Sequence, residues 1–84
     1  MTHHASPDFW AAYRNLPPHV QDLADHAYAR LKQDPHHPSL HFKRVGRLWS
    51  ARVGAHHRAL AVEAGSGLVW FWIGTHADYD RLLG

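Results

Sequence analysis

The chain has 84 residues, 10 of them histidine, with no cysteine and a formal net charge of +2 when the histidines are neutral. This length predicts a single domain over residues 1–84, and the lack of cysteine excludes disulfides and thiolate metal sites. The longest apolar run, Leu68–Ile73, is far too short to span a membrane. Since the start of the chain also lacks a signal-peptide pattern, we expect no membrane association and a cytoplasmic protein.

Two helices are predicted in the first part of the chain. Ser6-Pro7-Asp8 is typical of a helix start, and Asn15 with Pro17-Pro18 ends this first helix. A second helix is expected from about Pro18 to Gln33, because its apolar residues recur at helical spacing. That stripe consists of Val20, Leu23, Ala24, Ala27 and Leu31, and the first helix adds Phe9, Trp10 and Tyr13 as expected core residues. The two prolines predict a tight αα-hairpin.

Four strands are predicted after the proline-rich connector Asp34–Ser39. Expected strands cover residues 40–45, 48–53, 57–63 and 68–73, joined by short glycine-containing turns. The last of them is apolar throughout, which is typical of a strand buried on both faces inside a sheet. A short helical turn is expected over His76–Leu83. The fold class is therefore α+β, with an N-terminal αα-hairpin packed on one face of a small antiparallel β-sheet.

Positive charge is concentrated in the middle of the chain. Residues 35–62 contain no Asp or Glu. The same stretch carries the cations Lys43, Arg44, Arg47, Arg52 and Arg58 and the histidines His36, His37, His41, His56 and His57. Such a surface predicts an anionic ligand, either nucleic acid or an acidic protein, although solvated arginines on strands would give the same pattern.

Arg52 and Arg58 are the first candidates for a binding site. They lie on adjacent predicted strands near the turn between them, so their side chains should share one end of the sheet. Two guanidinium groups repel each other unless an anion such as phosphate lies between them. Lys43 or Arg44 on the preceding strand would add a third charge.

His76 is the candidate for proton transfer. It follows the buried strand at a Gly-Thr turn, and Tyr79 would lie on the same side of a helical turn beginning there. A bound phosphate favours the charged form of a nearby histidine, which suits a general acid or base near neutral pH. The alternative is a structural histidine that caps the last helix or packs against an indole. The paired histidines elsewhere lack metal-ligand spacing, so no metal site is expected.

Two motifs taken together resemble a known family. W-S-x-R-V-G-x-x-x-R-A spans Trp49–Ala59, and G-T-H-x-D-Y spans Gly74–Tyr79. With the helix-hairpin opening, these stretches are similar to the RelE/ParE superfamily of toxins from bacterial type II toxin–antitoxin pairs. Two departures stand out. The family usually opens with a full β-strand, for which only Met1–Ala5 is available, and His57 replaces an aromatic residue.

The resemblance implies a function and a set of site residues. Many members are ribosome-dependent mRNA endoribonucleases that inhibit translation without metal or cofactor, by positioning a 2′-hydroxyl to attack the neighbouring phosphate. The implied catalytic residues are Arg58 and His76, with Arg52 and Tyr79 as weaker matches, and the expected RNA-binding residues are Lys43, Arg44 and Arg47. The expected partners are a cognate antitoxin protein and mRNA on the ribosome.

Two other functions remain open at this point. A ParE-like DNA gyrase poison has the same fold but acts by binding a protein and needs no catalytic histidine. A non-catalytic binding module or a decayed toxin would also agree with the short first strand and with the departure at His57.

Overall fold

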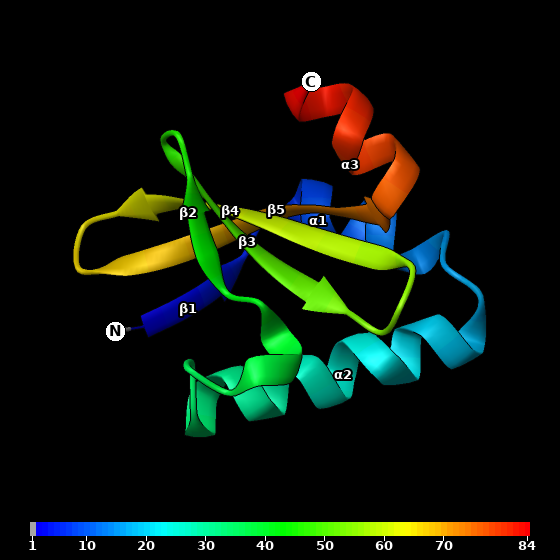
Figure 1. Cartoon of the computed structure of the whole chain (residues 1–84), viewed down its shortest axis with the longest axis horizontal. Helices are drawn as coiled ribbons and strands as arrows, with labels where there is room; N and C mark the ends of the chain where they lie inside the picture. The colour runs from blue at the N-terminus through cyan, green and yellow to red at the C-terminus, as the bar shows by residue number, and fades with distance from the viewer. Residues whose placement is uncertain (1) are drawn as a thin grey trace.

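Helices α1 and α2 lie against one face of a five-stranded sheet in the computed structural model, which describes residues 2–84 (Figure 1). Helix α3 follows the last strand and contacts β4 and β5. The elements are β1 Thr2–Ala5, α1 Pro7–Arg14, α2 Pro18–Gln33, the 3₁₀ helix η1 Pro38–Leu40, β2 Lys43–Val45, β3 Leu48–Val53, β4 His57–Ala64, β5 Gly67–Thr75 and α3 His76–Leu83. The sheet order is β1-β5-β4-β3-β2. The predicted α+β class and αα-hairpin are confirmed.

The sheet is mixed, which corrects the prediction of a purely antiparallel one. Strands β2 to β5 pair antiparallel in sequence order, as expected, but β1 pairs parallel with β5. Thr2 lies opposite Gly67, and a Cβ at Gly67 would overlap Thr2, so this close approach requires glycine. The short opening strand therefore exists. The sequence pattern did not show its partner, because the pairing joins opposite ends of the chain.

Both predicted helices form at the expected residues. The Ser6 hydroxyl accepts a hydrogen bond from the Phe9 backbone N–H at 3.2 Å, which caps α1. Helix α2 runs over the predicted range, but Leu23 does not join its buried stripe and is 43% exposed. Within residues 2–84, no helix is long and apolar enough to cross a membrane.

The strand expected at residues 40–45 is shorter than predicted. Leu40 belongs to the 3₁₀ helix η1, and only Lys43–Val45 is a strand. The backbone of Ser39 donates to His37 Nδ1 at 3.2 Å, which stabilises the helical turn that Pro38 begins. His41 then adopts φ 43°, a left-handed conformation that separates this turn from β2.

One face of the sheet packs in the core under the helices, and the other face lies opposite it. Alternate residues of β3 and β4 point toward α1 and α2, and Ala51, Ala59 and Ala61 belong to the core there. In β5, Leu60 pairs with Trp72 whereas Ala61 pairs with Trp70, so the strand contains a bulge at this point. The bulge turns Trp70 into the core and leaves Trp72 on the opposite face, beside Leu60.

Candidate functional site

Arg58 and His76, predicted from separate motifs, meet at the start of β4. Arg58 Nε donates a hydrogen bond to His76 Nδ1 at 3.4 Å. The contact is set by the backbone, because the N–H of His76 donates to the His56 carbonyl at 2.7 Å and fixes the start of α3 beside β4. An imidazole that accepts at Nδ1 carries its proton on Nε2 when neutral. His76 Nε2 lies 3.5 Å from Asp80 Oδ2, so a carboxylate is available on that side of the ring.

Tyr79 holds these two side chains in place. Its ring is buried and stacks on the imidazole of His76, with centroids 5.7 Å apart and 24° between the planes. The guanidinium carbon of Arg58 lies 5.4 Å from the centroid of the same ring, a cation–π distance. The structure therefore brings Arg58, His76 and Tyr79 together, with Tyr79 as the buried member that orients the other two.

Part of the Arg58 guanidinium has no hydrogen-bond partner. Among residues 2–84, Arg58 Nη1 and Ser50 Oγ are the buried side-chain polar atoms that lack one. A buried N–H without a partner is unfavourable, by about 1–3 kcal/mol for a neutral group and more for a charged one. An anion that drew the guanidinium outward would relieve this cost. Arg58 is therefore well suited to bind a negatively charged ligand.

Arg52 is the cross-strand partner of Arg58, but its guanidinium contacts other elements. Its Nε donates to the Gly54 carbonyl at 2.9 Å, and its Nη1 lies 3.5 Å from His41 Nε2. Neither arginine forms an ion pair with a carboxylate within residues 2–84. The two backbones are neighbours, as predicted, while one side chain reaches α3 and the other reaches the segment before β2.

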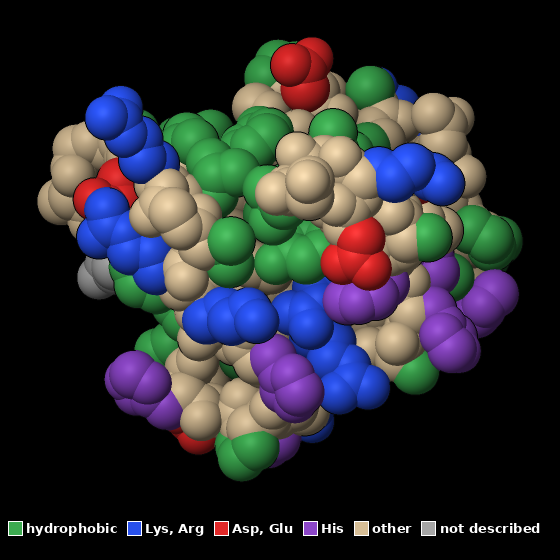
Figure 2. Space-filling view, turned by 45° about the horizontal axis from the view of Figure 1, so that its top comes forward, with side chains coloured by type: hydrophobic (Ala, Val, Ile, Leu, Met, Phe, Trp, Pro, Cys, Tyr) green, Lys and Arg blue, Asp and Glu red, His purple; other side chains and the backbone are tan. Residues whose placement is uncertain are grey.

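The three candidates for RNA binding lie in different surroundings. Lys43 pairs with Ser50, which places it on the same face as Arg58. Arg44 pairs with Trp49 and lies on the opposite face, where its Nη1 is 3.8 Å from Glu63 Oε1. Arg47 is exposed in the turn between β2 and β3. Figure 2 shows Lys, Arg and His side chains forming a band across one face of the molecule, beside a hydrophobic area.

Two residues near the site were not predicted from the sequence. Asp80 follows His76 at the i, i+4 spacing of a helix, so the helical turn predicted for this segment could have revealed it. His41 approaches Arg52 only because of the left-handed backbone after η1, which no sequence motif indicates. Among residues 2–84, no group of three or more His, Asp or Glu side chains is arranged to hold a metal ion.

The cap of α3 is expected to control the geometry at His76. The Thr75 hydroxyl accepts a hydrogen bond from the Asp78 backbone N–H at 3.1 Å. Thr75→Ala should lower the free energy of unfolding by about 1 kcal/mol and speed amide hydrogen exchange in α3, whereas Thr75→Ser should restore both. Urea denaturation and hydrogen exchange would measure these effects. Unchanged exchange in α3 of Thr75→Ala would show that the cap does not hold the helix.

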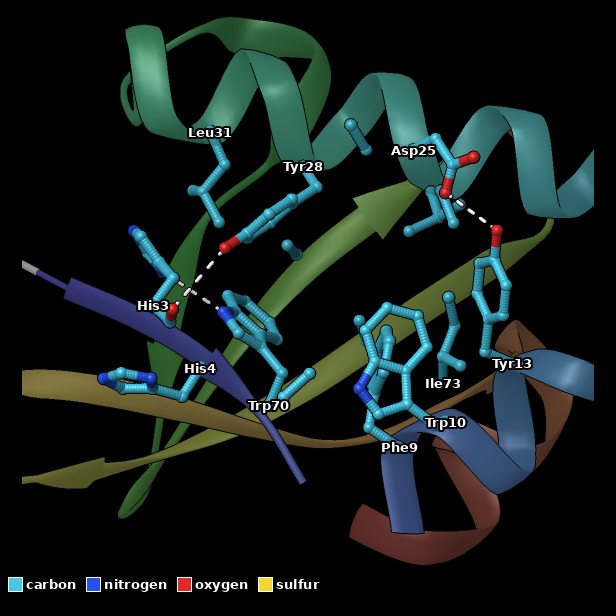
Figure 3. A pocket seen from close by; sticks show the side chains of 16 residues that line it. His3, His4, Phe9, Trp10, Tyr13, Asp25, Tyr28, Leu31, Trp70 and Ile73 are labelled. Carbon is cyan, nitrogen blue, oxygen red and sulfur yellow. Dashed lines mark hydrogen bonds between the residues drawn. The ribbon is translucent and has the colours of Figure 1, made fainter. Parts of the chain in front are cut away.

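An apolar cavity lies on the other side of the sheet. It has a volume of about 330 Å³ between α1, α2 and the strands β1 and β5. Figure 3 shows aromatic side chains around it, with Trp70 Nε1 donating to His3 Nδ1 at 3.1 Å and Tyr13 donating to Asp25 Oδ1 at 2.9 Å. Trp10, expected in the core, is 45% exposed at its rim. The cavity is thus separate from Arg58 and His76.

The contact between His3 and Trp70 predicts a loss of stability in mild acid. Burial, helped by the positive charge of Lys32, lowers the pKa of His3 below its usual 6.5. The unfolded chain then binds more protons than the folded one below pH 6.5, so the free energy of unfolding falls as pH decreases through that range. Burial also lowers the pKa of His57, which acts in the same direction.

Thermal melts of two glutamine variants would test this pH dependence. We expect the melting temperature to fall between pH 7.5 and pH 5.5, and to fall less in His3→Gln, because glutamine accepts the Trp70 N–H without titrating. His36→Gln, changed at an exposed histidine outside this contact, is the control and should keep the wild-type dependence. Equal pH dependence in His3→Gln and wild type would contradict the assignment.

Comparison with known proteins places this chain in a family. A family model described as the ParE-like toxin domain matches residues 18–81. No curated protein matches the chain by sequence at a significant level.

Several solved structures are similar in fold. A RelB–RelE antitoxin–toxin complex from Methanococcus jannaschii has a TM-score of 0.73 at 10% identity, covering 96% of this chain and 99% of that one. A YoeB/ParE toxin from Agrobacterium tumefaciens has a TM-score of 0.69 at 18% identity, covering 90% and 99%. YafQ from Escherichia coli BL21(DE3) has a TM-score of 0.69 at 14% identity, covering 99% and 98%. At these identities the likeness concerns the fold.

Proposed function

The chain belongs to the ParE-like toxin domain family, and from that premise we propose that it is the toxin of a type II toxin–antitoxin pair that cuts mRNA on the ribosome. The observation that carries this proposal is the contact between Arg58 and His76, on a face where Lys43 and Arg52 add positive charge. A phosphate-binding cation beside a proton-transfer group is the arrangement that phosphodiester cleavage requires.

The proposed reaction is an intramolecular transesterification. The 2′-hydroxyl of one nucleotide gives its proton to solvent as its oxygen attacks the adjacent phosphorus, and the bond from phosphorus to the 5′-oxygen breaks. The products are a 2′,3′-cyclic phosphate and a 5′-hydroxyl, so the leaving oxygen must gain a proton. Negative charge increases on the phosphate during the attack, and fixed cations stabilise it there.

Each residue of the site has a role in this reaction. Arg58, whose Nη1 has no partner, binds the scissile phosphate. When the Arg58 guanidinium moves to the phosphate, its hydrogen bond to His76 Nδ1 breaks and that nitrogen can take a proton. Protonated His76 then donates to the leaving 5′-oxygen as the general acid. Tyr79 is a positioning residue, because its buried ring stacks on His76 rather than facing a ligand.

A cognate antitoxin is the second proposed partner. The similar structure from Methanococcus jannaschii is a complex of toxin and antitoxin. Residues 35–62 of this chain have five Lys and Arg and no Asp or Glu, so an antitoxin with an acidic segment would be complementary to it. Covering Arg58 and His76 in this way would also keep RNA out of the site.

A DNA gyrase poison is the alternative that the matching family model favours, because that model is described as ParE-like. Such a poison acts by binding a protein and has no need for the contact between Arg58 and His76. One experiment separates the two functions. Purified protein is added to ribosomes translating a defined mRNA, and in parallel to gyrase with supercoiled DNA.

Cut mRNA bearing 2′,3′-cyclic phosphate and 5′-hydroxyl ends would support the proposed ribonuclease. Trapped gyrase–DNA cleavage complexes with intact mRNA would refute it in favour of the poison. If folded protein affects neither reaction, the chain is a binding module with a toxin fold.

A further inference from the structure

A second cationic site lies next to the proposed catalytic one, in a groove between α2, η1 and the end of β3. The groove has a volume of about 290 Å³ and is separate from the apolar cavity behind the sheet. Arg30 of α2, Ser39 of η1 and Arg52 of β3 contribute its polar side chains together with His26. No Asp or Glu is among the described residues that line it.

The groove exists because β2 is short. Strand β2 pairs only with Leu48–Ser50, so the outer edge of β3 beyond Ser50 has no neighbouring strand. Arg52 extends across this open edge, where its Nε donates to the Gly54 carbonyl and its Nη1 lies near His41. The guanidinium of Arg52 is thereby held at the groove rather than beside Arg58.

Arg30 lies on the opposite side of the same groove. Its Nη1 donates to Ser39 Oγ at 3.0 Å, which ties the exposed end of α2 to η1. Neither Arg30 nor Arg52 forms an ion pair within residues 2–84. A guanidinium has five N–H donors, so each of these arginines keeps several donors that no described residue occupies. Two such groups around one hollow are complementary in charge and hydrogen bonding to a phosphate.

We propose that this groove, formed by Arg30, Ser39 and Arg52, binds a backbone phosphate of the RNA strand next to the phosphate that is cut. The inference rests on the proposed function and deepens it. Arg52 is the cross-strand partner of Arg58, so the backbone segments that carry the groove and the Arg58–His76 site are neighbours in the sheet. A single strand carries one phosphate per nucleotide, so a strand with one phosphate at Arg58 has further phosphates available for a second cationic site. The second contact fixes the direction of the strand across the site.

Binding of a short single-stranded RNA with 2′-O-methyl groups tests the groove without cleavage, because this probe has no free 2′-hydroxyl to attack. Fluorescence anisotropy at several salt concentrations gives the slope of log K against log salt. Losing one phosphate contact should reduce the magnitude of that slope by about 0.7. We expect this reduction, with weaker binding, in Arg30→Gln. Arg30→Lys retains the charge and should retain the wild-type slope.

Arg14→Gln is the matched control, since Arg14 is an exposed arginine at the end of α1 and does not line the groove. An equal change of slope in Arg14→Gln and Arg30→Gln would overturn the inference, because the effect would then reflect overall charge. An unchanged slope in Arg30→Gln would also overturn it. If Arg30→Gln binds the probe normally but cuts mRNA on ribosomes more slowly, the phosphate belongs to ribosomal RNA and not to the message, which contradicts the proposal.

The experiments distinguish rejection of the phosphate-binding groove from rejection of the ribonuclease activity. If the wild-type protein cuts mRNA on ribosomes and Arg30→Gln shows no binding defect, only the phosphate-binding groove is rejected. Wild-type protein that neither binds the probe nor cuts mRNA would remove the ribonuclease, and with it the groove.

Discussion

His76→Ala is expected to slow mRNA cleavage by about 100- to 10,000-fold, the range that a general acid contributes. His76 is the residue whose proton reaches the leaving 5′-oxygen in the proposed reaction, and alanine can neither hold nor donate it. Folding should be little affected, because roughly half of the His76 side chain is exposed (49%) and its backbone N–H, which anchors α3, remains. Single-turnover cleavage of mRNA on programmed ribosomes would measure the rate.

Two further variants make this result specific. Arg58→Ala should lose cleavage to a similar extent, and Arg58→Lys should restore only part of it, since a lysine cannot donate in the planar fork of a guanidinium. His19→Ala, at an exposed position near the start of α2, is the control and should cut at the wild-type rate. A His76→Ala protein that cuts as fast as the control would exclude His76 from the mechanism.

Trp70→Ala is expected to have the largest effect on stability, a loss of about 3–5 kcal/mol in the free energy of unfolding. Trp70 is 5% exposed, belongs to the core and joins β5 to β1 through its hydrogen bond to His3. A domain of this size has a total stability of roughly 4–13 kcal/mol, so the variant loses a large share of it and is unfolded if the wild type lies at the low end of this range. Urea denaturation followed by circular dichroism would measure the change.

Trp10→Ala is the matched control for this prediction. The indole of Trp10 is 45% exposed and lies at the rim of the apolar cavity, so its removal leaves little unfilled core. We expect a loss well below that of Trp70→Ala. If the two variants were equally destabilised, the distinction between the buried and the exposed indole would be wrong.

Local signals in the sequence predicted most of the fold. Ser6, Pro7 and Asn15 mark the ends of α1 by capping chemistry, and alternation along β3 and β4 correctly separates the core face from the face of Arg58. The same alternation placed Arg52 and Arg58 side by side. The contact of Arg58 with His76 depends on the hydrogen bond from the His76 N–H to the His56 carbonyl, which strand alternation does not specify.

Features that depend on distant parts of the chain were not predictable. The parallel pairing of β1 with β5 joins residues 2–5 to residues 67–70, and no local pattern specifies it. The groove at Arg52 depends on where β2 ends and on the left-handed backbone of His41. The first part of the expected strand is instead a 3₁₀ turn. The direction of each arginine side chain follows from these details and not from strand register.

The most direct test of the proposed ribonuclease is to map mRNA 5′ ends at ribosomes in cells that express either the wild-type protein or Arg58→Ala. We expect growth arrest with new 5′ ends at fixed positions within codons for the wild type. Both effects should be absent for folded Arg58→Ala. Growth arrest by wild-type protein without new 5′ ends would contradict the account.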